Sequence, residues 1–196
     1  MTDEQIKALI ITIPIILISF LVLDRVGLKV IRASRHTTFV SSKSAQDRLA
    51  AIYTAEIGVR ELTGNNDGKR VEEYLRSCGL GKGYAWCAAF VNWCHVQAGV
   101  VGAGSAWSPD WFPDKNTIYT RGNSGNKTPS KTDVLGLYYP EKKRIAHVGF
   151  IDEWGDGANY CITVEGNTNG EGSREGDGVY RKRRLKSQIY KVSRWI

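Results

Sequence analysis

A cysteine stands at the front of an apolar helical segment in the stretch GYAWCAAFVNWC, which covers residues 83–94. Cys87 is expected in the first turn of that helix, where free N–H groups and the helix dipole stabilise a thiolate. The same N–H groups are suited to hold the oxyanion of an acyl transfer. Glycines just upstream, in GLGKGYAW, would let a substrate approach closely. The alternative is that Cys87 only begins a buried stripe, because free cysteine is among the most buried residue types.

A cysteine nucleophile needs a base, and two histidines follow the N-terminal region. His95 lies on the same expected helix, about 12 Å along the axis from Cys87, which is too far to take its proton. His147 lies in the strand-like stretch RIAHVGFIDEW. A histidine in such a strand is also commonly a hydrogen-bonded core residue, so the base is a hypothesis that depends on its neighbours.

A carboxylate is expected beside His147. If WGDGAN closes a hairpin centred on Asp156, His147 lies directly opposite Glu165 and on the same face of the sheet. Glu165 would then orient the imidazole and stabilise its cation, which completes a Cys-His-Glu relay. Asn167, two residues further on, is the alternative orienting group or a helper.

The runs WCAAFVNWC, AHVGFI and VEGNTN, in this order, resemble the CHAP family, the cysteine- and histidine-dependent amidohydrolases/peptidases of bacterial and phage peptidoglycan lysis. The upstream run IGVRELTGNNDGKRVEEYL resembles the lead-in of one CHAP subgroup, so the resemblance covers residues 46–196. It implies a papain-like fold and cleavage of a peptide cross-link or of the sugar–peptide amide. It also implies that Cys87 is the nucleophile, that His147 is base and then acid, and that Glu165 and Asn167 orient the imidazole.

The chain departs from the family pattern in three places. Many CHAP domains carry Gln directly before the nucleophile, but Trp86 stands there, so the second oxyanion donor is open. Thr132-Asp133 replaces the Gly-Asp that usually opens the first central strand. Some members bind calcium through acidic residues before the cysteine, whereas no acidic residue lies between Gly79 and Cys87, and NNDG lacks the spacing of a calcium loop. We therefore expect no metal and no cofactor.

Other residues near Cys87 have two interpretations each. Four aromatic residues are candidates for substrate contact, although loop aromatics also commonly fill a core: Tyr84, Trp86, Trp107 and Trp111. Cys94 lies seven residues after Cys87 on the same helix and cannot form a disulfide with it. The sequence leaves the pairing of Cys78 and Cys161 open.

The order of elements predicts an α+β fold, in which N-terminal helices pack on an antiparallel sheet. Helical spacing from Ser44, a plausible N-cap, places Leu49, Ile52, Tyr53 and Ile57 on one stripe of the segment 44–62. Helices over 71–78 and 86–98 each end at a glycine. After a long irregular stretch, strands are expected over 134–139, 144–153, 160–165, 179–183 and 188–195.

The first residues predict a membrane anchor. Ala8–Leu23 contains no charge and would span roughly 24 Å as a helix, which Lys7 and Arg25 can extend by snorkelling. The front MTDEQIK is not basic and no small-residue exit follows, so we expect an uncleaved anchor rather than a signal peptide. The expected organisation is an anchor with its flanks in residues 1–35, a linker in 36–43 and a CHAP-like catalytic domain in 44–196.

The charge pattern bears on topology and partners. Basic residues are denser after the expected span than before it, which by the positive-inside rule leaves the domain in the cytoplasm. Family analogy favours the opposite, because a wall hydrolase must reach its substrate. The net charge is +7, and residues 181–194 hold seven basic side chains and no acidic one. They predict a solvated edge strand or a surface for an anionic polymer, and the mildly acidic remainder argues against nucleic acid.

The function predicted from these observations is that of a peptidoglycan hydrolase, either an endopeptidase or an N-acetylmuramoyl-L-alanine amidase, acting through a Cys-His-Glu thiol mechanism. Its partners would be peptidoglycan and, through residues 8–23, a membrane. Two alternatives remain: an amidase of a small cytoplasmic amide on the same fold, and a non-catalytic membrane-anchored module that binds the cell wall.

Overall fold

The computed structural model describes residues 43–157, 159–170 and 176–196. The membrane span expected in residues 8–23 lies outside these residues, as does the linker expected in 36–43 except for its last residue. Among the described residues, no helix combines the length and the apolar character needed to cross a membrane. The expected boundaries between anchor, linker and domain stay a prediction.

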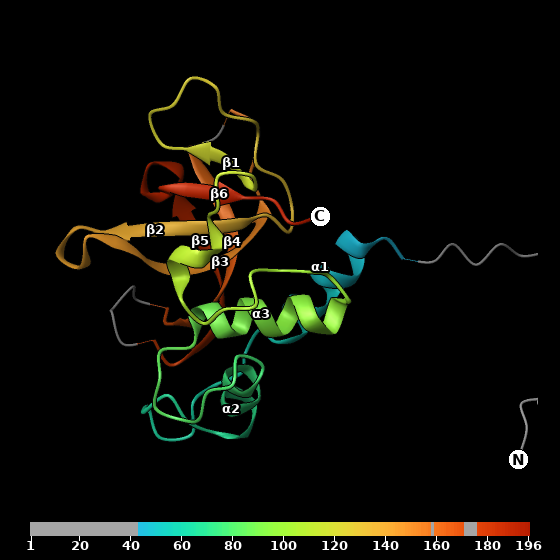
Figure 1. The fold of residues 1–196 in the computed structure, drawn as a ribbon, viewed down its shortest axis with the longest axis vertical. Coiled ribbons are helices and arrows are strands. Elements are labelled where there is room, and N and C mark those ends of the chain that lie inside the picture. The colour runs from blue at the N-terminus through green and yellow to red at the C-terminus, as the bar shows by residue number, and fades with distance from the viewer. Residues whose placement is uncertain (1–42, 158, 171–175) are drawn as a thin grey trace, which may run out of the picture. The chain divides into compact units, whose positions relative to one another are not determined.

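Within the described residues, three α-helices precede a six-stranded antiparallel sheet, which confirms the α+β prediction and is consistent with a papain-like fold (Figure 1). The helices are α1 (Ala45–Ala55), α2 (Lys69–Arg76) and α3 (Cys87–Ala98). The strands are β1 (Thr117–Thr120), β2 (Val134–Tyr139), β3 (Arg144–Glu153), β4 (Tyr160–Thr168), β5 (Gly178–Leu185) and β6 (Lys191–Ser193). They lie in the order β1-β6-β2-β3-β4-β5. Short 3-10 helices η1 (Ser108–Trp111), η2 (Pro140–Lys142) and η3 (Lys186–Gln188) interrupt the connections.

The first helix begins where predicted and ends earlier. The Ser44 hydroxyl accepts the backbone N–H of Asp47 at 3.0 Å, which confirms the N-cap. Helix α1 stops at Ala55 because the next residues pair with β5 instead: the N–H of Gly58 donates to the carbonyl of Val179 at 3.0 Å. Helical periodicity cannot reveal this pairing, since its partner lies more than a hundred residues away.

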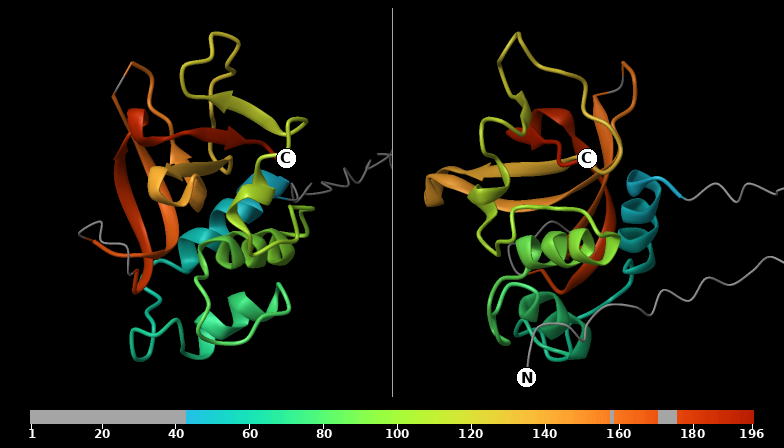
Figure 2. Two further views of the ribbon diagram at one scale, coloured as in Figure 1. Left: turned by 60° about the vertical axis from the view of Figure 1, so that its left-hand side comes forward. Right: turned by 45° about the vertical axis from the view of Figure 1, so that its right-hand side comes forward.

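Helix α3 packs against β3 and β4, while α1 and α2 pack against α3. Figure 2 shows the three helices on one side of the strands, with α3 between α2 and the sheet. The close approach needs a glycine in β4, because a Cβ on Gly166 would lie 2.7 Å from the ring of Trp86 and 2.8 Å from Phe90. At its other end α3 terminates on Gly99, whose φ of 67° is the left-handed conformation of a C-cap.

The strand bounds predicted for β2 and β3 are confirmed, β4 and β5 are longer than predicted, and β6 is shorter. Strand β1 falls in the stretch expected to be irregular, because its four residues are all half-buried and show no apolar alternation. It pairs with β6, for example Thr120 with Lys191, and so becomes one edge of the sheet.

The predicted pairing of His147 with Glu165 is wrong by two residues. Phe150 pairs with Val164, so Gly149 lies opposite Glu165, and the hairpin is centred on residue 157. A bulge between Ile151 and Glu153 then adds one residue to β3, so the pairing shifts again toward the turn. A shift of two residues preserves the face, and Glu165 therefore remains on the His147 side of the sheet.

The basic run 181–194 covers most of β5, an edge strand that fits the edge-strand interpretation, and all of β6, which lies inside the sheet between β1 and β2. Three of its arginines pair with carboxylates: Arg181 with Asp152, Arg184 with Glu165 at 2.5 Å and Arg194 with Asp133 at 2.7 Å. These pairs leave fewer free cations for an anionic polymer than the sequence suggests.

Candidate active site

Cys87 is the first residue of α3, and the residue before it is held from two sides. The backbone N–H of Trp86 donates to the Asn167 side-chain oxygen at 3.3 Å, and its indole N–H donates to Glu61 at 2.8 Å. Because Trp86 is fully buried, the start of the helix and the sulfur carried on it have a fixed position. The first N–H groups of the helix have no intrahelical acceptor and adjoin this sulfur.

The thiol meets the imidazole of His147. Nε2 of His147 lies 2.7 Å from Oε2 of Glu165, which leaves Nδ1 to interact with Cys87, whose pKa His147 lowers. His147 has an exposed fraction of 7% and Glu165 of 0%, so both groups interact in a medium of low polarity. The structure thus brings together a thiol, an imidazole and a carboxylate from α3, β3 and β4.

Glu165 is held by more groups than the imidazole. The Thr163 hydroxyl donates to Oε1 at 2.6 Å, and the Arg184 guanidinium donates to both carboxylate oxygens at 2.5 Å. Burial raises the pKa of Glu165, but the hydrogen bonds and charges of Arg184 and His147 outweigh it and hold the pKa well below its usual range. The carboxylate therefore remains ionised when it faces the imidazole. The role of Arg184 has no signal in the sequence, because Arg184 is one of several cations in a basic run.

The same contacts shift the two groups that would react. Burial raises the pKa of Cys87, but the hydrogen bond and charge of His147 and the hydroxyl of Ser108 bring it down to about 7. Burial lowers the pKa of His147, yet its hydrogen bonds to Cys87 and Glu165 raise it to about 9. Between these values the thiolate–imidazolium pair is favoured, a state suited to nucleophilic attack.

Gly149 allows the carboxylate to reach the imidazole. A Cβ on this residue would lie 2.5 Å from Cγ of Glu165 and 2.9 Å from the carbonyl oxygen of Val164. The Glu165 side chain therefore crosses the strand above Gly149 and contacts His147 diagonally. A glycine inside an otherwise apolar strand pattern is the sequence signal that could have indicated this close approach.

We expect Gly149→Ala to displace Glu165 and to lower the hydrolysis rate about a hundredfold, as small misplacements of catalytic groups do. Gly136→Ala is the matched control, because its Cβ would lie 2.5 Å from the Phe112 ring and strains the same sheet on β2, which does not carry Glu165 or His147. Rates are measured on protein shown by circular dichroism to be folded. Equal losses of rate in the two variants would contradict a specific role for Gly149.

Ser108 is a second residue that the sequence did not single out. Its Oγ lies 3.7 Å from Sγ of Cys87, and its exposed fraction is 4%. It is the first residue of η1, which begins Ser-Pro and follows the loop after α3. A thiolate can only accept a hydrogen bond, so the hydroxyl donates to the charged form of Cys87 and favours it. Trp86, whose indole N–H is bound to Glu61, cannot serve as the second oxyanion donor.

Ser108→Ala should raise the pKa of the Cys87 thiol and shift the pH midpoint of its alkylation upward, because one donor to the thiolate is lost. The midpoint is measured by mass spectrometry of the peptide that carries Cys87. Ser108→Thr retains a hydroxyl and should restore most of the shift. If alanine and threonine behave alike, the hydroxyl does not act on the sulfur.

Asn167 does not contact His147. Its side-chain oxygen accepts from the N–H of Trp86 at 3.3 Å, and its amide donates to Asn66 at 3.0 Å. The expectation that Asn167 orients the imidazole is therefore corrected: the amide ties the end of β4 to the residue before the nucleophile. Asn167 adopts a φ of 52°, and with Glu61 it forms the polar cluster that fixes the start of α3.

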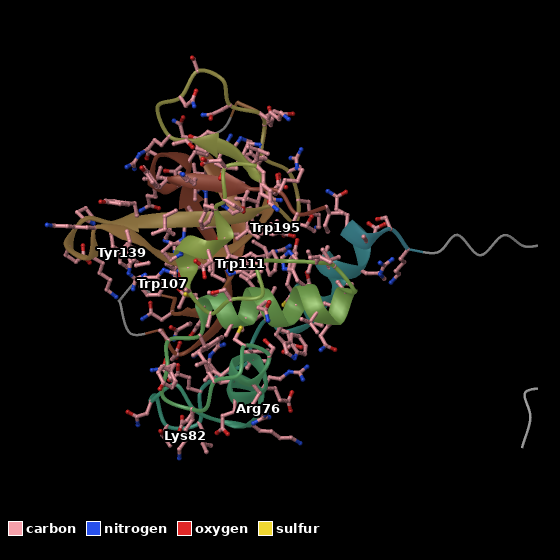
Figure 3. All side chains as sticks on the ribbon, viewed as in Figure 1. Arg76, Lys82, Trp107, Trp111, Tyr139 and Trp195 are labelled. Carbon is pink, nitrogen blue, oxygen red and sulfur yellow. The ribbon has the colours of Figure 1, made fainter. Side chains whose placement is uncertain are left out.

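A cavity of about 330 Å³ opens over Cys87. Its walls include Tyr84 and Trp107, whose exposed fractions are 57% and 50%. Figure 3 shows Trp107 near the N-terminal end of α3. Trp86 and Trp111 are fully buried, which corrects the expectation that they contact a substrate. The sequence does not show whether a loop tryptophan points outward, because it can pack inward wherever its indole N–H finds a partner. The indole N–H of Trp111 donates to the carbonyl of Ser105 at 3.0 Å.

The remaining histidine and cysteines of the domain are structural. Nδ1 of His95 donates to the Val91 carbonyl at 2.8 Å, and burial lowers the pKa of His95 to about 4, so it stays neutral and away from the thiol. Cys78, Cys94 and Cys161 are free thiols, so Cys78 and Cys161 do not form a disulfide in this structure. Among the described residues, no three acidic, histidine or cysteine side chains gather as a metal site would require.

The family model of the CHAP domain matches residues 79–167, which confirms the resemblance over this part of the residues 46–196 for which the sequence suggested it. RipD of Mycobacterium tuberculosis is similar in structure, with a TM-score of 0.46 and 11% sequence identity over 79% of this chain and 100% of RipD. RipD is described as a non-catalytic NlpC/p60 domain protein with an adaptation to peptidoglycan-binding function. RipB of the same organism, described as a peptidoglycan hydrolase, is similar at 14% identity and a TM-score of 0.45, over 78% of this chain and 65% of RipB, less than two thirds of that protein. No curated protein matches the sequence.

Proposed function

Residues 79–167 match the CHAP domain model, and we propose that the chain hydrolyses an amide bond of peptidoglycan, as an endopeptidase or as an N-acetylmuramoyl-L-alanine amidase. The observation that supports the proposal most strongly is that His147, which is hydrogen-bonded to Glu165, lowers the pKa of the Cys87 thiol, and that Cys87 lines a cavity. A purely structural cysteine would have its pKa raised by burial, as those of Cys94 and Cys161 are.

In the first half of the proposed reaction, the Cys87 thiolate attacks the carbonyl carbon of the amide. The negative charge that develops on the carbonyl oxygen faces the N-terminal N–H groups of α3. His147, as imidazolium, then gives its proton to the leaving nitrogen. The carbon–nitrogen bond breaks, the amine departs, and a thioester and a neutral imidazole remain.

In the second half, a water molecule attacks the thioester while His147 accepts one of its protons. The carbon–sulfur bond breaks, and the carboxylic acid product leaves with the thiolate–imidazolium pair restored. Glu165 keeps its negative charge throughout, so its role is to orient the imidazole and to stabilise the cation, and Arg184 and Thr163 keep the carboxylate in place.

The test of this proposal is mass analysis of the fragments released from purified peptidoglycan by the full chain in mild detergent. A free amino group at a peptide cross-link would identify an endopeptidase, and peptide-free sugar chains would identify the amidase. Cys87→Ala should release neither fragment. Release that persists in this variant, or none from the parent protein, would contradict the proposal, and the second result would favour a non-catalytic module.

The rate of hydrolysis should depend on pH in a bell shape. Activity rises as the Cys87 thiol loses its proton, with a pKa of about 7, and falls as the His147 imidazolium loses its proton, with a pKa of about 9. The maximum should therefore lie near pH 8, measured as kcat/KM on a soluble peptide fragment. A rate that keeps rising above pH 9 would indicate that neutral His147 is the active form.

We also propose that the domain works on the outer side of the membrane, because its proposed substrate lies there. The density of basic residues after residue 23 argues for the opposite orientation. Protease added to spheroplasts should therefore digest the domain, whereas a domain in the cytoplasm would survive until the cells are lysed.

A further inference from the structure

Two cationic side chains line the cavity that Cys87 also lines. Lys142 ends η2 and Arg144 begins β3, so both come from the turn that joins β2 to β3, and both line the cavity. Leu80 and Tyr84 are among the other residues that line it. Within the part of the chain that the structure describes, Lys142 and Arg144 are the only Lys, Arg, Asp or Glu side chains that line this cavity.

Arg144 is held in place without a carboxylate partner among the described residues. Its guanidinium stacks on the Trp107 ring, with its carbon 3.9 Å from the ring centroid, and Nη1 donates to the carbonyl of Ile145 at 3.0 Å. Stacking leaves the edge of a guanidinium free to donate two parallel hydrogen bonds to a carboxylate. Lys142 is exposed, and its described contact is with the Tyr139 ring, 6.0 Å from Nζ to the centroid.

The contrast with the basic run 181–194 is informative. There, Arg181, Arg184 and Arg194 each pair with a carboxylate of the protein itself. Lys142 and Arg144 have no such pair in the described structure, yet they border the nucleophile. A ligand that entered the cavity could therefore supply the missing negative charge.

We propose that Lys142 and Arg144 bind a free carboxylate of the substrate next to the bond that Cys87 attacks, and that this contact selects carboxylate-bearing peptides over amidated ones. The inference rests on the proposed function and names its substrate class. A cavity of about 330 Å³ holds only a few residues of a peptide, so the carboxylate lies close to the scissile amide. Lys142 is exposed, so the selection should weaken as salt concentration increases.

The experiment compares purified peptidoglycan with the same material after its carboxylates have been amidated by carbodiimide and ammonia. The full chain in mild detergent should release amino groups about tenfold faster from the untreated material, as expected for a charged hydrogen bond. The double variant Lys142→Gln/Arg144→Gln should lower the rate on untreated material about tenfold, so that the two materials are cleaved at similar rates. Lys115→Gln/Lys127→Gln removes the same charge at exposed positions outside the cavity and should retain the preference.

The possible results separate the two proposals. If the parent protein cleaves both materials equally, or if the double variant keeps the full preference, the carboxylate site is wrong while hydrolysis stands. If the parent protein cleaves neither, the catalytic proposal fails. The carboxylate site is then tested by measuring how much of the Cys87→Ala protein sediments with each material. Tighter binding to untreated peptidoglycan that Lys142→Gln/Arg144→Gln abolishes would support the site, and equal binding would overturn it.

Discussion

Replacing Cys87 with alanine should stop amide hydrolysis, lowering kcat by at least about a thousandfold, because the covalent intermediate can no longer form. The sulfur is the only part of Cys87 that enters the proposed reaction. Cys87→Ser should be nearly as inactive, since a hydroxyl with an ordinary pKa is not ionised by His147 as the thiol is. Release of amino groups from peptidoglycan measures the loss.

Cys78→Ser provides the control. Cys78 is half-buried and free, and its sulfur lies 3.8 Å from the Ser77 hydroxyl, away from the cavity. Burial raises the pKa of Cys78, whereas the pKa of Cys87 is lowered. This variant should keep the rate within about twofold, as surface-proximal substitutions usually do. If Cys87→Ala and Cys78→Ser lose activity to the same extent, the assignment of the nucleophile is wrong.

Glu165→Gln should impair both catalysis and folding. Without the negative charge, the imidazolium of His147 loses its partner, and a loss of about ten-thousandfold in kcat is the scale known for a triad carboxylate. The Arg184 side chain, with an exposed fraction of 14%, would be left as a buried charge without its carboxylate. Removing one partner of such a pair costs about 3–5 kcal/mol of the free energy of unfolding, measured by urea denaturation.

Arg184→Met combined with Glu165→Gln separates the two effects. Removing both charges should recover a large part of the free energy of unfolding, because no unpaired charge remains buried. It should recover none of kcat, since the group that orients His147 is still absent. If kcat returned together with stability, the low activity of Glu165→Gln would reflect poor folding, and Glu165 would have no direct effect on the imidazole.

Much of the fold could be predicted because its signals are local. The N-cap at Ser44, the glycine after α3 and the bounds of β2 and β3 all follow from residues within one turn or one strand. The end of α1 could not, because it depends on pairing with β5, and β1 could not, because four half-buried residues carry no periodic pattern. Helical periodicity predicts that a segment forms a helix, whereas pairing with a distant strand decides at which residue the helix ends.

The candidate site was predictable in its residue types and less so in its geometry. Cys87, His147 and Glu165 were found from helix position, strand context and family resemblance, and the structure brings them together. The register was wrong by two residues because the centre of a six-residue turn cannot be read from its composition. The contact survives because Gly149 lets Glu165 reach diagonally. Ser108 and Arg184 were missed because they approach from segments whose placement only the packed fold determines.

The most direct test of the account is the pH dependence of Cys87 alkylation by iodoacetamide, followed on its own peptide by mass spectrometry. In the unmodified chain the midpoint should lie near pH 7, because His147 lowers the pKa of the thiol. In His147→Ala, burial, which raises the pKa of the thiol most, is opposed by the Ser108 hydroxyl without the imidazole, and the midpoint should rise above the ordinary thiol value of about 8.5. Midpoints that coincide in the two proteins would show that the imidazole does not act on the sulfur.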